Sequence, residues 1–401
     1  MIITEIIKFF YFLYSIYVIL IINCTSLVFY DMLPSLIILW INYFVFTMGY
    51  FSYKAKSCCN SSENKPCKPW LLKLSKGNML FIAILSICFS IMVTNYYTGQ
   101  TPFSIIDNIS NNISLYYEYQ TYFRDQQRGA FSLTKLPFIF MAFYIKLLLF
   151  YSYITLFIFK SKLNKFDIIY LFLISIAHIY FGIARGTNFE YFELTVLIIF
   201  IILIKYSGKY KFSIKLLLKV GILISCMIFL FYSIIKERGV SLNYYISRDV
   251  FFDQKGIVST ILPFLSFIVI MIYSYFGFGF YYISSYINYI WFESGTNIFL
   301  GLLPFGFKSI NNNSLKYLMN NIVDMGARWH PDIIFIIERF GYLGLLLFCF
   351  FLGMFAKCKD KSPIVYLTNF MIFLQMISLP VGNFISTSSS NKLIVMTLIF
   401  Y

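Results

Sequence analysis

The stretch from Met325 to Phe355, MGARWHPD followed by IIFIIERFGYLGLLLFCFFLGMF, decides the fold class of this chain. Its second part, 333–355, is an apolar run long enough to cross the ~30 Å hydrocarbon core of a membrane as a helix. Pro331 fits the first position of that helix, where its missing N–H costs nothing, so we expect His330 at the helix cap. A helix N-terminus attracts anions and disfavours an imidazolium ion. The stretch therefore predicts a neutral, basic imidazole beside an anion site at a membrane surface.

Apolar runs of 17 or more residues recur along the whole sequence. The chain is 60% hydrophobic and only 12% charged, which is far from the composition of a soluble protein. We therefore predict an all-α fold, a polytopic transmembrane helical bundle of about 11–12 spans that forms a single integral membrane domain over 1–401. The first apolar run, 9–22, has no small-residue cleavage site after it, so we expect it to remain as the first span.

The lysines predict the orientation of the chain in the membrane. The loop 52–77 carries six lysines against a single Glu63, so by the positive-inside rule this loop and the N-terminus are cytoplasmic. The expected spans include 6–23, 33–51, 78–95, 136–159, 167–184, 190–204, 217–235, 333–355 and 363–381. The loops 96–135, 236–258 and 301–331 then lie on the external, periplasmic face, where we expect two or three of them to form an active site.

Two segments leave the topology open. In 259–300, Phe276–Gly279 is interpreted either as a tight inner turn between two spans or as a kink in a re-entrant segment. Residues 392–401 are too short to cross the membrane.

Arginine and lysine are segregated between the two faces. The four cytoplasmic loops hold seventeen lysines and no arginine, whereas all seven arginines fall in external loops or at external helix mouths. Guanidinium forks bind phosphate bidentately and stay charged at any pH, so this asymmetry favours an external diphosphate site. The alternative is that the arginines anchor external loops to each other or to lipid headgroups. The seven are Arg124, Arg128, Arg185, Arg238, Arg248, Arg328 and Arg339.

Local spacing adds detail for two of them. Arg124 and Arg128 are four residues apart in a segment, 114–128, that is predicted to be a helix ending at Gly129. Aromatic residues precede them and offer ring faces on which sugars could stack: Tyr116, Tyr117, Tyr119, Tyr122 and Phe123. An interfacial aromatic belt is the alternative interpretation.

Two further arginines lie at expected helix mouths. The capping-box pattern of Thr187–Glu190 begins a span just after Arg185, so Arg185 is expected at the entrance between two helix ends. Asp332 and Arg339 are seven residues apart on one helix face, so Arg339 is either neutralised at the membrane boundary or functional. His178, inside the span 167–184, has no neighbouring ligand set and is interpreted as a packing or helix-bonding residue.

Three short motifs resemble those of bacterial O-antigen polymerases and ligases, over roughly 180–355. Phe181–Gly186, FGIARG, followed by an apolar span, is similar to their "S-R-G then helix" element, with Ala184 in place of serine. His330-Pro331-Asp332, followed by ERFGYLGL at 338–345, resembles their "H-N … E-x-G-x-x-G-L-L" element, with Pro331 in place of asparagine. Leu303–Gly306 resembles the Gly-rich stretch before that histidine. The overall form, with Lys-rich inner loops, is most similar to Wzy-type polymerases.

This resemblance implies a surface-polysaccharide polymerase of lipopolysaccharide biosynthesis in the bacterial inner membrane. Such an enzyme transfers the growing glycan from an undecaprenyl-diphosphate carrier onto a lipid-linked repeat unit at the periplasmic face. Its partners are that donor and acceptor, membrane lipids and a chain-length regulator protein, with no nucleic acid and no cofactor. An O-antigen ligase, which differs in its acceptor, and a non-enzymatic flippase are the alternatives. A flippase should have two related halves and charges along a central path, whereas this sequence has no internal repeat and its charges cluster outside.

Glycosyl transfer from a lipid diphosphate needs a base for the acceptor hydroxyl and fixed cations for the leaving diphosphate. We predict that His330 is the base, with a purely orienting role as the alternative. The predicted catalytic clamps are Arg185, Arg328 and Arg339. The predicted substrate- and diphosphate-binding residues are Arg124, Arg128, Arg238, Arg248, Glu118, Tyr119 and Trp329. No D-x-D-like motif occurs in an external loop, so we expect a reaction without a metal.

Overall fold

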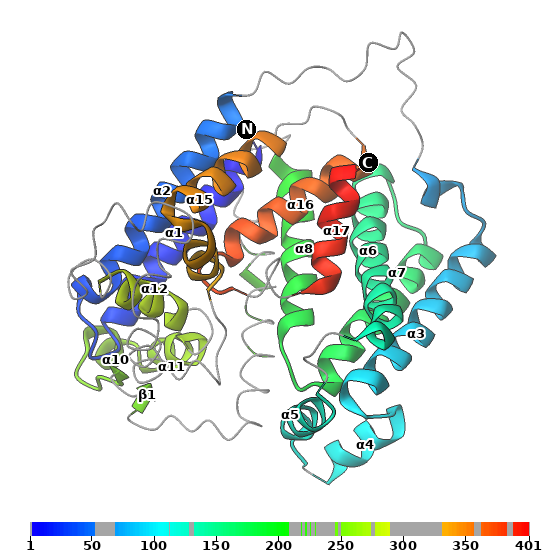
Figure 1. Cartoon of the computed structure of the whole chain (residues 1–401), viewed down its shortest axis with the longest axis horizontal. Coiled ribbons are helices and arrows are strands. Elements are labelled where there is room, and N and C mark those ends of the chain that lie inside the picture. Colours follow the sequence, from blue (N-terminus) through cyan, green and yellow to red (C-terminus); the bar gives the residue numbers. More distant parts are fainter. Residues whose placement is uncertain are drawn as a thin grey trace. The chain divides into compact units, whose positions relative to one another are not determined.

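The structure, a computed structural model of the chain, is helical through most of its described residues (Figure 1). The described residues are 2–52, 69–111, 113–127, 132–207, 218, 221–222, 225, 229, 245–247, 250–273, 277–288, 331–356, 362–382 and 388–400. Within them the chain forms two compact units. The predicted all-α polytopic fold is confirmed.

Six helices in the described part of the chain are long and apolar enough to cross a membrane. They are α1 (Ile2–Ile22), α2 (Phe29–Ser52), α3 (Lys76–Thr98), α6 (Leu136–Phe159), α7 (Lys165–Ala184) and α15 (Asp332–Phe355). They coincide with the predicted spans 6–23, 33–51, 78–95, 136–159, 167–184 and 333–355. The chain is therefore embedded in a membrane. The expected span 217–235 falls largely outside the described residues, so the total of about 11–12 spans stays a prediction.

The first unit is organised around α2 and α15, which run side by side (Figure 1). The two helices approach closely at two glycines: a Cβ atom on Gly49 would collide with the carbonyl oxygen of Phe350, and one on Gly353 with that of Phe46. Small residues of this kind let membrane helices pack backbone against backbone. The unit also contains β1 (Tyr245–Ser247), β2 (Val250–Phe251), α10 (Ile257–Ile261), α11 (Pro263–Ile272), α12 (Phe278–Asn288), α1 and the second half of α16 (Pro363–Ser378).

The start of α15 differs from the prediction by one residue. Pro331 is the N-cap, with ψ 135°, and the helix begins at Asp332. The expectation that Pro331 is the first helical residue and His330 the cap is therefore wrong, because Pro331 keeps an extended ψ.

A second feature of α15 is a break at Gly341. This residue has φ 72° and ψ 177°, a backbone conformation that favours glycine, and it separates the helix into two segments. The predicted single span 333–355 is thus two helical pieces in sequence.

The predicted irregular segment at Phe276–Gly279 lies partly outside the described residues. α11 ends at Ile272 and α12 begins at Phe278, and the described residues between them, Tyr273 and Gly277, are π-helical. Residues 274–276 lie outside the described part, and both interpretations of this segment stay open.

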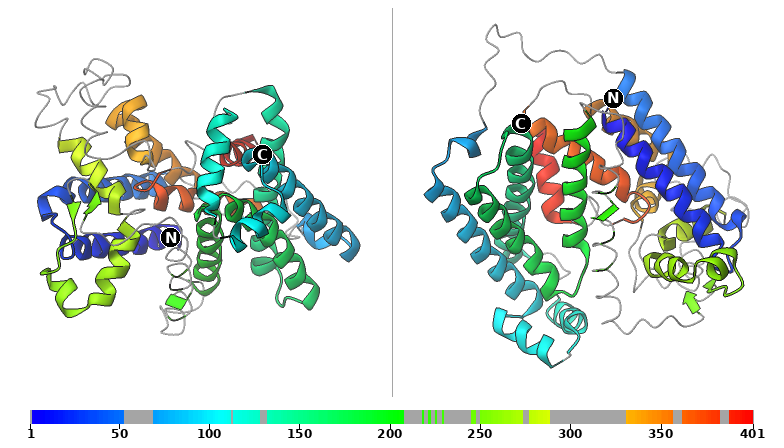
Figure 2. Two further views of the ribbon diagram at one scale, coloured as in Figure 1. Left: turned by 90° about the horizontal axis from the view of Figure 1, so that it is seen from below. Right: turned by 180° about the vertical axis from the view of Figure 1, so that it is seen from behind.

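The second unit is built on α3 and α7, which lie side by side (Figure 2). The Ser90 hydroxyl donates to the carbonyl oxygen of Ala177, and the rings of Tyr97 and Phe181 are 5.9 Å apart. Residues later in α3 thus contact residues later in α7. The two helices are therefore parallel and end on the same side of the unit. The other elements are η1 (Trp70–Lys73), α4 (Pro102–Ser110), α5 (Leu115–Asp125), η2 (Leu133–Lys135), α6, α8 (Phe189–Ser207), the first half of α16 and α17 (Ser389–Phe400).

The helix α5 is the one predicted over 114–128. Ser114 caps it, its side chain accepting a hydrogen bond from the backbone N–H of Tyr117. The helix ends at Asp125, however, and Gln127 has a left-handed φ of 49°. The predicted end at Gly129 is therefore wrong, because the chain leaves the helix before it. Arg128 lies outside the described residues.

Candidate functional site

Arg185 lies where the sequence predicts, between two helix ends. It is the C-cap of α7, and α8 begins at Phe189. Its side chain is 18% exposed and forms an ion pair with Glu190 in the first turn of α8. The Thr187 hydroxyl donates to Oε2 of Glu190 at 3.3 Å, which fits the predicted capping pattern. A Cβ atom on Gly182 would lie 2.8 Å from the same Oε2, so glycine leaves room for this carboxylate.

Aromatic rings flank the Arg185 guanidinium. Its Cζ is 4.3 Å from the ring centroid of Phe181 and 5.8 Å from that of Tyr119 on α5. The position of α5 depends on Gly186, which has φ 56°: a Cβ atom there would lie 2.9 Å from the backbone nitrogen of Tyr116. Burial by itself lowers the pKa of the guanidinium, but Glu190 and Tyr119 raise it, and the net effect is a pKa above the usual value for arginine.

Two buried amides also lie beside helix ends in this unit. Gln100 follows the end of α3 and Asn188 precedes α8, and both side chains are buried. In the described structure, neither amide has a hydrogen-bond partner for its nitrogen or its oxygen, and the same holds for Nε of Arg185. Buried polar groups of this kind cost free energy unless water or a ligand satisfies them. We call Gln100, Tyr119, Phe181, Arg185, Asn188 and Glu190 the Arg185 site.

The Arg185 site combines a buried cation with buried amides that have no hydrogen-bond partner in the described structure. A guanidinium Nε and two amides offer donors, the amide oxygens accept from hydroxyl groups, and Tyr119 offers a ring face. The Glu190 carboxylate pairs with Nη2 of the guanidinium, and the buried Nε has no hydrogen-bond partner in the described structure.

Two other predicted residues of α5 lie on the surface of the unit. The Arg124 side chain is 79% exposed, with an ion pair of 3.9 Å to its neighbour Asp125. Exposed pairs of this kind contribute about 0–1 kcal/mol. Glu118 is also exposed. The structure therefore brings Tyr119, but not Arg124, against Arg185.

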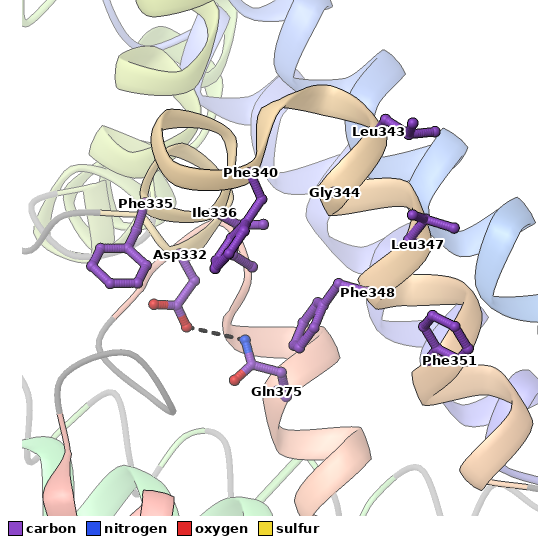
Figure 3. Close-up of a pocket in the computed structure, with 10 residues that line it drawn as sticks. All are labelled: Asp332, Phe335, Ile336, Phe340, Leu343, Gly344, Leu347, Phe348, Phe351 and Gln375. Atoms are coloured by element: carbon purple, nitrogen blue, oxygen red, sulfur yellow. Dashed lines mark hydrogen bonds between the residues drawn. The ribbon is translucent and has the colours of Figure 1, made fainter. Parts of the chain in front are cut away.

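In the first unit, Arg339 is exposed and lies over the ring of Phe335, with Cζ 4.0 Å from the ring centroid. Asp332 is buried and accepts a hydrogen bond of 3.0 Å from the amide of Gln375 (Figure 3). Among the ion pairs of the described residues there is none between Asp332 and Arg339. The predicted neutralisation of Arg339 by Asp332 is therefore not found there.

Asp332 and Gln375 form the polar part of an otherwise apolar pocket of about 510 Å³ (Figure 3). The bend of α15 between Phe340 and Leu343 shapes it. Its apolar lining comes from α15: Phe335, Ile336, Phe340, Leu343, Gly344, Leu347, Phe348 and Phe351. Such a lining suits a hydrocarbon chain.

The remaining predicted site residues lie outside the described part of the chain, and their roles stay predictions. They are His330, Arg328, Trp329, Arg128, Arg238 and Arg248. In the part that is described, no three His, Cys, Asp or Glu side chains come together as metal ligands.

The structure also contains a charged cluster that the sequence analysis missed. In the second unit, Nζ of Lys146 donates to Oε1 of Glu193 at 2.9 Å, and Nε2 of His178 lies 3.3 Å from Oε2. Asn391 on α17 contacts the same cluster. The expectation that the charges cluster outside is wrong for Lys146 and Glu193, whereas the contact of His178 with Glu193 on α8 is in line with the helix-bonding interpretation of this histidine. The sequence feature that could have indicated this cluster is the presence of Lys146 within the span 136–159 and of Glu193 within 190–204, because ionisable residues inside a membrane are usually functional.

No family model, curated protein or solved structure matches this chain. The resemblance to O-antigen polymerases therefore stays a prediction.

Proposed function

We propose that this chain is a membrane glycosyltransferase, a polysaccharide polymerase that transfers a glycan from a polyprenyl-diphosphate carrier onto a lipid-linked repeat unit. The observation that carries the proposal is the Arg185 site, at the end of the membrane helices α3 and α7. A diphosphate ligand would use the guanidinium, and sugar hydroxyls would use the unpartnered amides of Gln100 and Asn188. The Tyr119 ring provides a face for a sugar ring. A ligand anchored in lipid presents its head group at this level of the membrane.

The chemistry assigns a separate task to each predicted group. The acceptor hydroxyl oxygen forms a bond to the anomeric carbon of the donor, while the bond from that carbon to the diphosphate oxygen breaks. The hydroxyl proton goes to His330, a general-base step that is typically worth 10²–10⁴ in rate. Arg185, held in place by Glu190, stabilises the charge that develops on the leaving diphosphate, and a fixed donor of this kind contributes roughly 3 kcal/mol. Arg328 and Arg339 are further predicted clamps.

Deletion of the gene, followed by gel display of surface lipopolysaccharide, tests the proposal. Core bearing one repeat unit supports a polymerase. Bare core indicates a ligase or a flippase and contradicts the proposal.

The buried charges favour a second candidate, a flippase for lipid-linked oligosaccharide. Lys146 is buried within the membrane helix α6 and pairs with the buried Glu193 of α8, and transporters place ionisable residues inside the membrane. An assay in detergent micelles separates the two, since micelles have no second compartment. A polymerase extends lipid-linked repeat units in micelles, whereas a flippase forms no product.

A further inference from the structure

The pocket beside the break of α15 combines an apolar wall with a small polar part (Figure 3). Its volume of about 510 Å³ is in the range of small-molecule sites, roughly 300–1,000 Å³. On its wall, Phe340, Leu347 and Phe351 are 50%, 47% and 50% exposed, so the wall is accessible in the described structure. In its polar part, Asp332 and Gln375 are each 1% exposed. We call this cavity the α15 pocket.

Hydrogen bonds of the backbone fix the position of the polar part. The Tyr11 hydroxyl of α1 donates to the backbone carbonyl oxygen directly after Gln375, at 2.9 Å. The backbone N–H of Ile333 donates to the carbonyl oxygen of Leu379 at 3.3 Å, which ties the start of α15 to the end of α16. The two helices that form the polar part are thus held together by bonds that do not involve its side chains.

Asp332 determines which way the Gln375 amide faces. Nε2 of Gln375 donates to Oδ2 of Asp332 at 3.0 Å, and the opposite orientation of the amide would set two acceptor oxygens against each other. Oε1 of Gln375 is buried and has no hydrogen-bond partner among the described residues. A buried acceptor costs free energy unless something donates to it. The polar part of the α15 pocket therefore favours a ligand that donates a hydrogen bond.

The lining restricts the head group of such a ligand. A phosphate head group brings acceptor oxygens and negative charge, and the described lining includes no lysine or arginine to pair with it. Arg339 lies over the ring of Phe335, but it is exposed and is not part of the lining. A hydroxyl group donates one hydrogen bond and carries no charge that would have to be buried. The lining therefore fits a neutral hydroxyl head group.

The wall restricts the rest of the ligand to hydrocarbon. α15 is long and apolar enough to cross a membrane, so ligands dissolved in the bilayer are the ones available to its pocket. Lipid tails are as apolar as the wall, so contact with the tail alone gives little preference for one lipid over another. Selection therefore depends on the hydrogen bond of the head group.

We propose that the α15 pocket binds a long-chain alcohol, whose hydroxyl group donates to Oε1 of Gln375 and whose hydrocarbon chain lies along the wall from Phe340 to Phe351. Binding makes and breaks no covalent bond. The pocket lies in the first unit and Arg185 in the second, so the proposal does not depend on glycosyl transfer.

Two photoreactive probes test the head group. Both are derivatives of hexadecanol with a diazirine in mid-chain, but one keeps the hydroxyl group and the other is its methyl ether, which cannot donate. The full chain is reconstituted in phosphatidylcholine nanodiscs and irradiated, and labelled peptides are mapped by mass spectrometry. We expect the hydroxyl probe to label 335–351 about two- to tenfold more strongly than the ether, the range for one hydrogen bond between neutral groups. Equal labelling by the two probes would overturn the proposal.

Competition identifies the class of lipid. An excess of hexadecanol should displace the hydroxyl probe, whereas hexadecyl phosphate should not. Displacement by hexadecyl phosphate would mean that the pocket takes an anionic lipid, which would overturn the proposal as well.

Variants of the wall and of the polar part locate the binding. Leu347→Trp fills the wall and should abolish labelling of 335–351 by both probes. Ile37→Trp on α2 is the matched control, because Ile37 is 48% exposed but does not line the pocket, and it should label like the wild type. The double variant Asp332→Leu, Gln375→Leu removes both members of the hydrogen bond together, and labelling by the two probes should become equal. Full labelling of Leu347→Trp, or a folded double variant that still prefers the hydroxyl probe, would overturn the proposal. The readout needs no enzymatic activity, so failure of the polymerase proposal leaves it intact.

Discussion

Replacing Arg185 by lysine should reduce chain extension by about ten- to hundred-fold. Lysine keeps the positive charge and can still pair with Glu190, but it loses the planar fork and the Nε donor that has no partner in the described structure. A hydrogen bond to a charged group contributes about 1.5–3 kcal/mol. Since 1.36 kcal/mol corresponds to a factor of ten in rate, the loss of one such bond in the transition state gives that range.

The matched control is Arg124→Lys, the same substitution on an exposed side chain. Arg124 is 79% exposed and pairs with Asp125 at 3.9 Å, so the change should cost at most about 1 kcal/mol, or roughly fivefold in rate. Both purified variants are reconstituted in nanodiscs with a radiolabelled lipid-linked repeat unit, and product length is measured over time. Thermal unfolding of each variant reports whether the fold is kept.

Equal rates for Arg185→Lys and Arg124→Lys would refute the clamp. Arg185 would then be a structural tie between α7 and α8 through Glu190. A large loss of activity at an unchanged melting temperature is the result that the reasoning requires.

Three further predictions concern packing, orientation and the base. Gly353→Ala should lower the stability of the protein by about 1–3 kcal/mol, because the new methyl group collides with a carbonyl oxygen of α2, and the melting temperature should fall. Gly77→Ala is the control: its Cβ atom would have its nearest neighbour at 3.9 Å, so the melting temperature should change little. In a cysteine-free background, a cysteine at position Ser62 should resist an impermeant thiol reagent in intact cells and one at Asn111 should react, and labelling at Ser62 would reverse the predicted orientation. His330→Gln keeps hydrogen-bonding capacity but should abolish chain extension with substrate binding intact, and long polymer from the purified variant would remove His330 from the role of base.

The membrane helices were predictable because their signal is local. The span expected at 136–159 is the helix α6, Leu136–Phe159. An apolar run that ends at Lys160 crosses a bilayer as a helix because a helix satisfies all of its backbone hydrogen bonds internally. The same holds for α7, where Asn164 and Asp167 form a capping box before the apolar run. Length, hydropathy and caps are properties of neighbouring residues in sequence.

The meeting of Lys146, His178 and Glu193 inside the second unit was not predictable in the same way. α6 and α7 are apolar around most of their circumference, so the sequence does not indicate which face of each helix meets its neighbours. Lys146, His178 and Glu193 meet because three helices have particular rotations, and no local pattern encodes those. The pairing of Arg185 with Glu190 was within reach, because both lie in one short turn between two helices.

The interruption of α15 at Gly341 has a consequence for the biogenesis of the protein. At this point the ladder of backbone hydrogen bonds is broken, and hydrocarbon cannot solvate the N–H and carbonyl groups that are released. Gly341 is buried, so these groups are tolerated only against protein neighbours. A nascent segment that enters the bilayer before it has neighbours must therefore be a continuous helix. α2 precedes α15 in the chain and packs against it, so α2 can supply the protein neighbour that the bend requires.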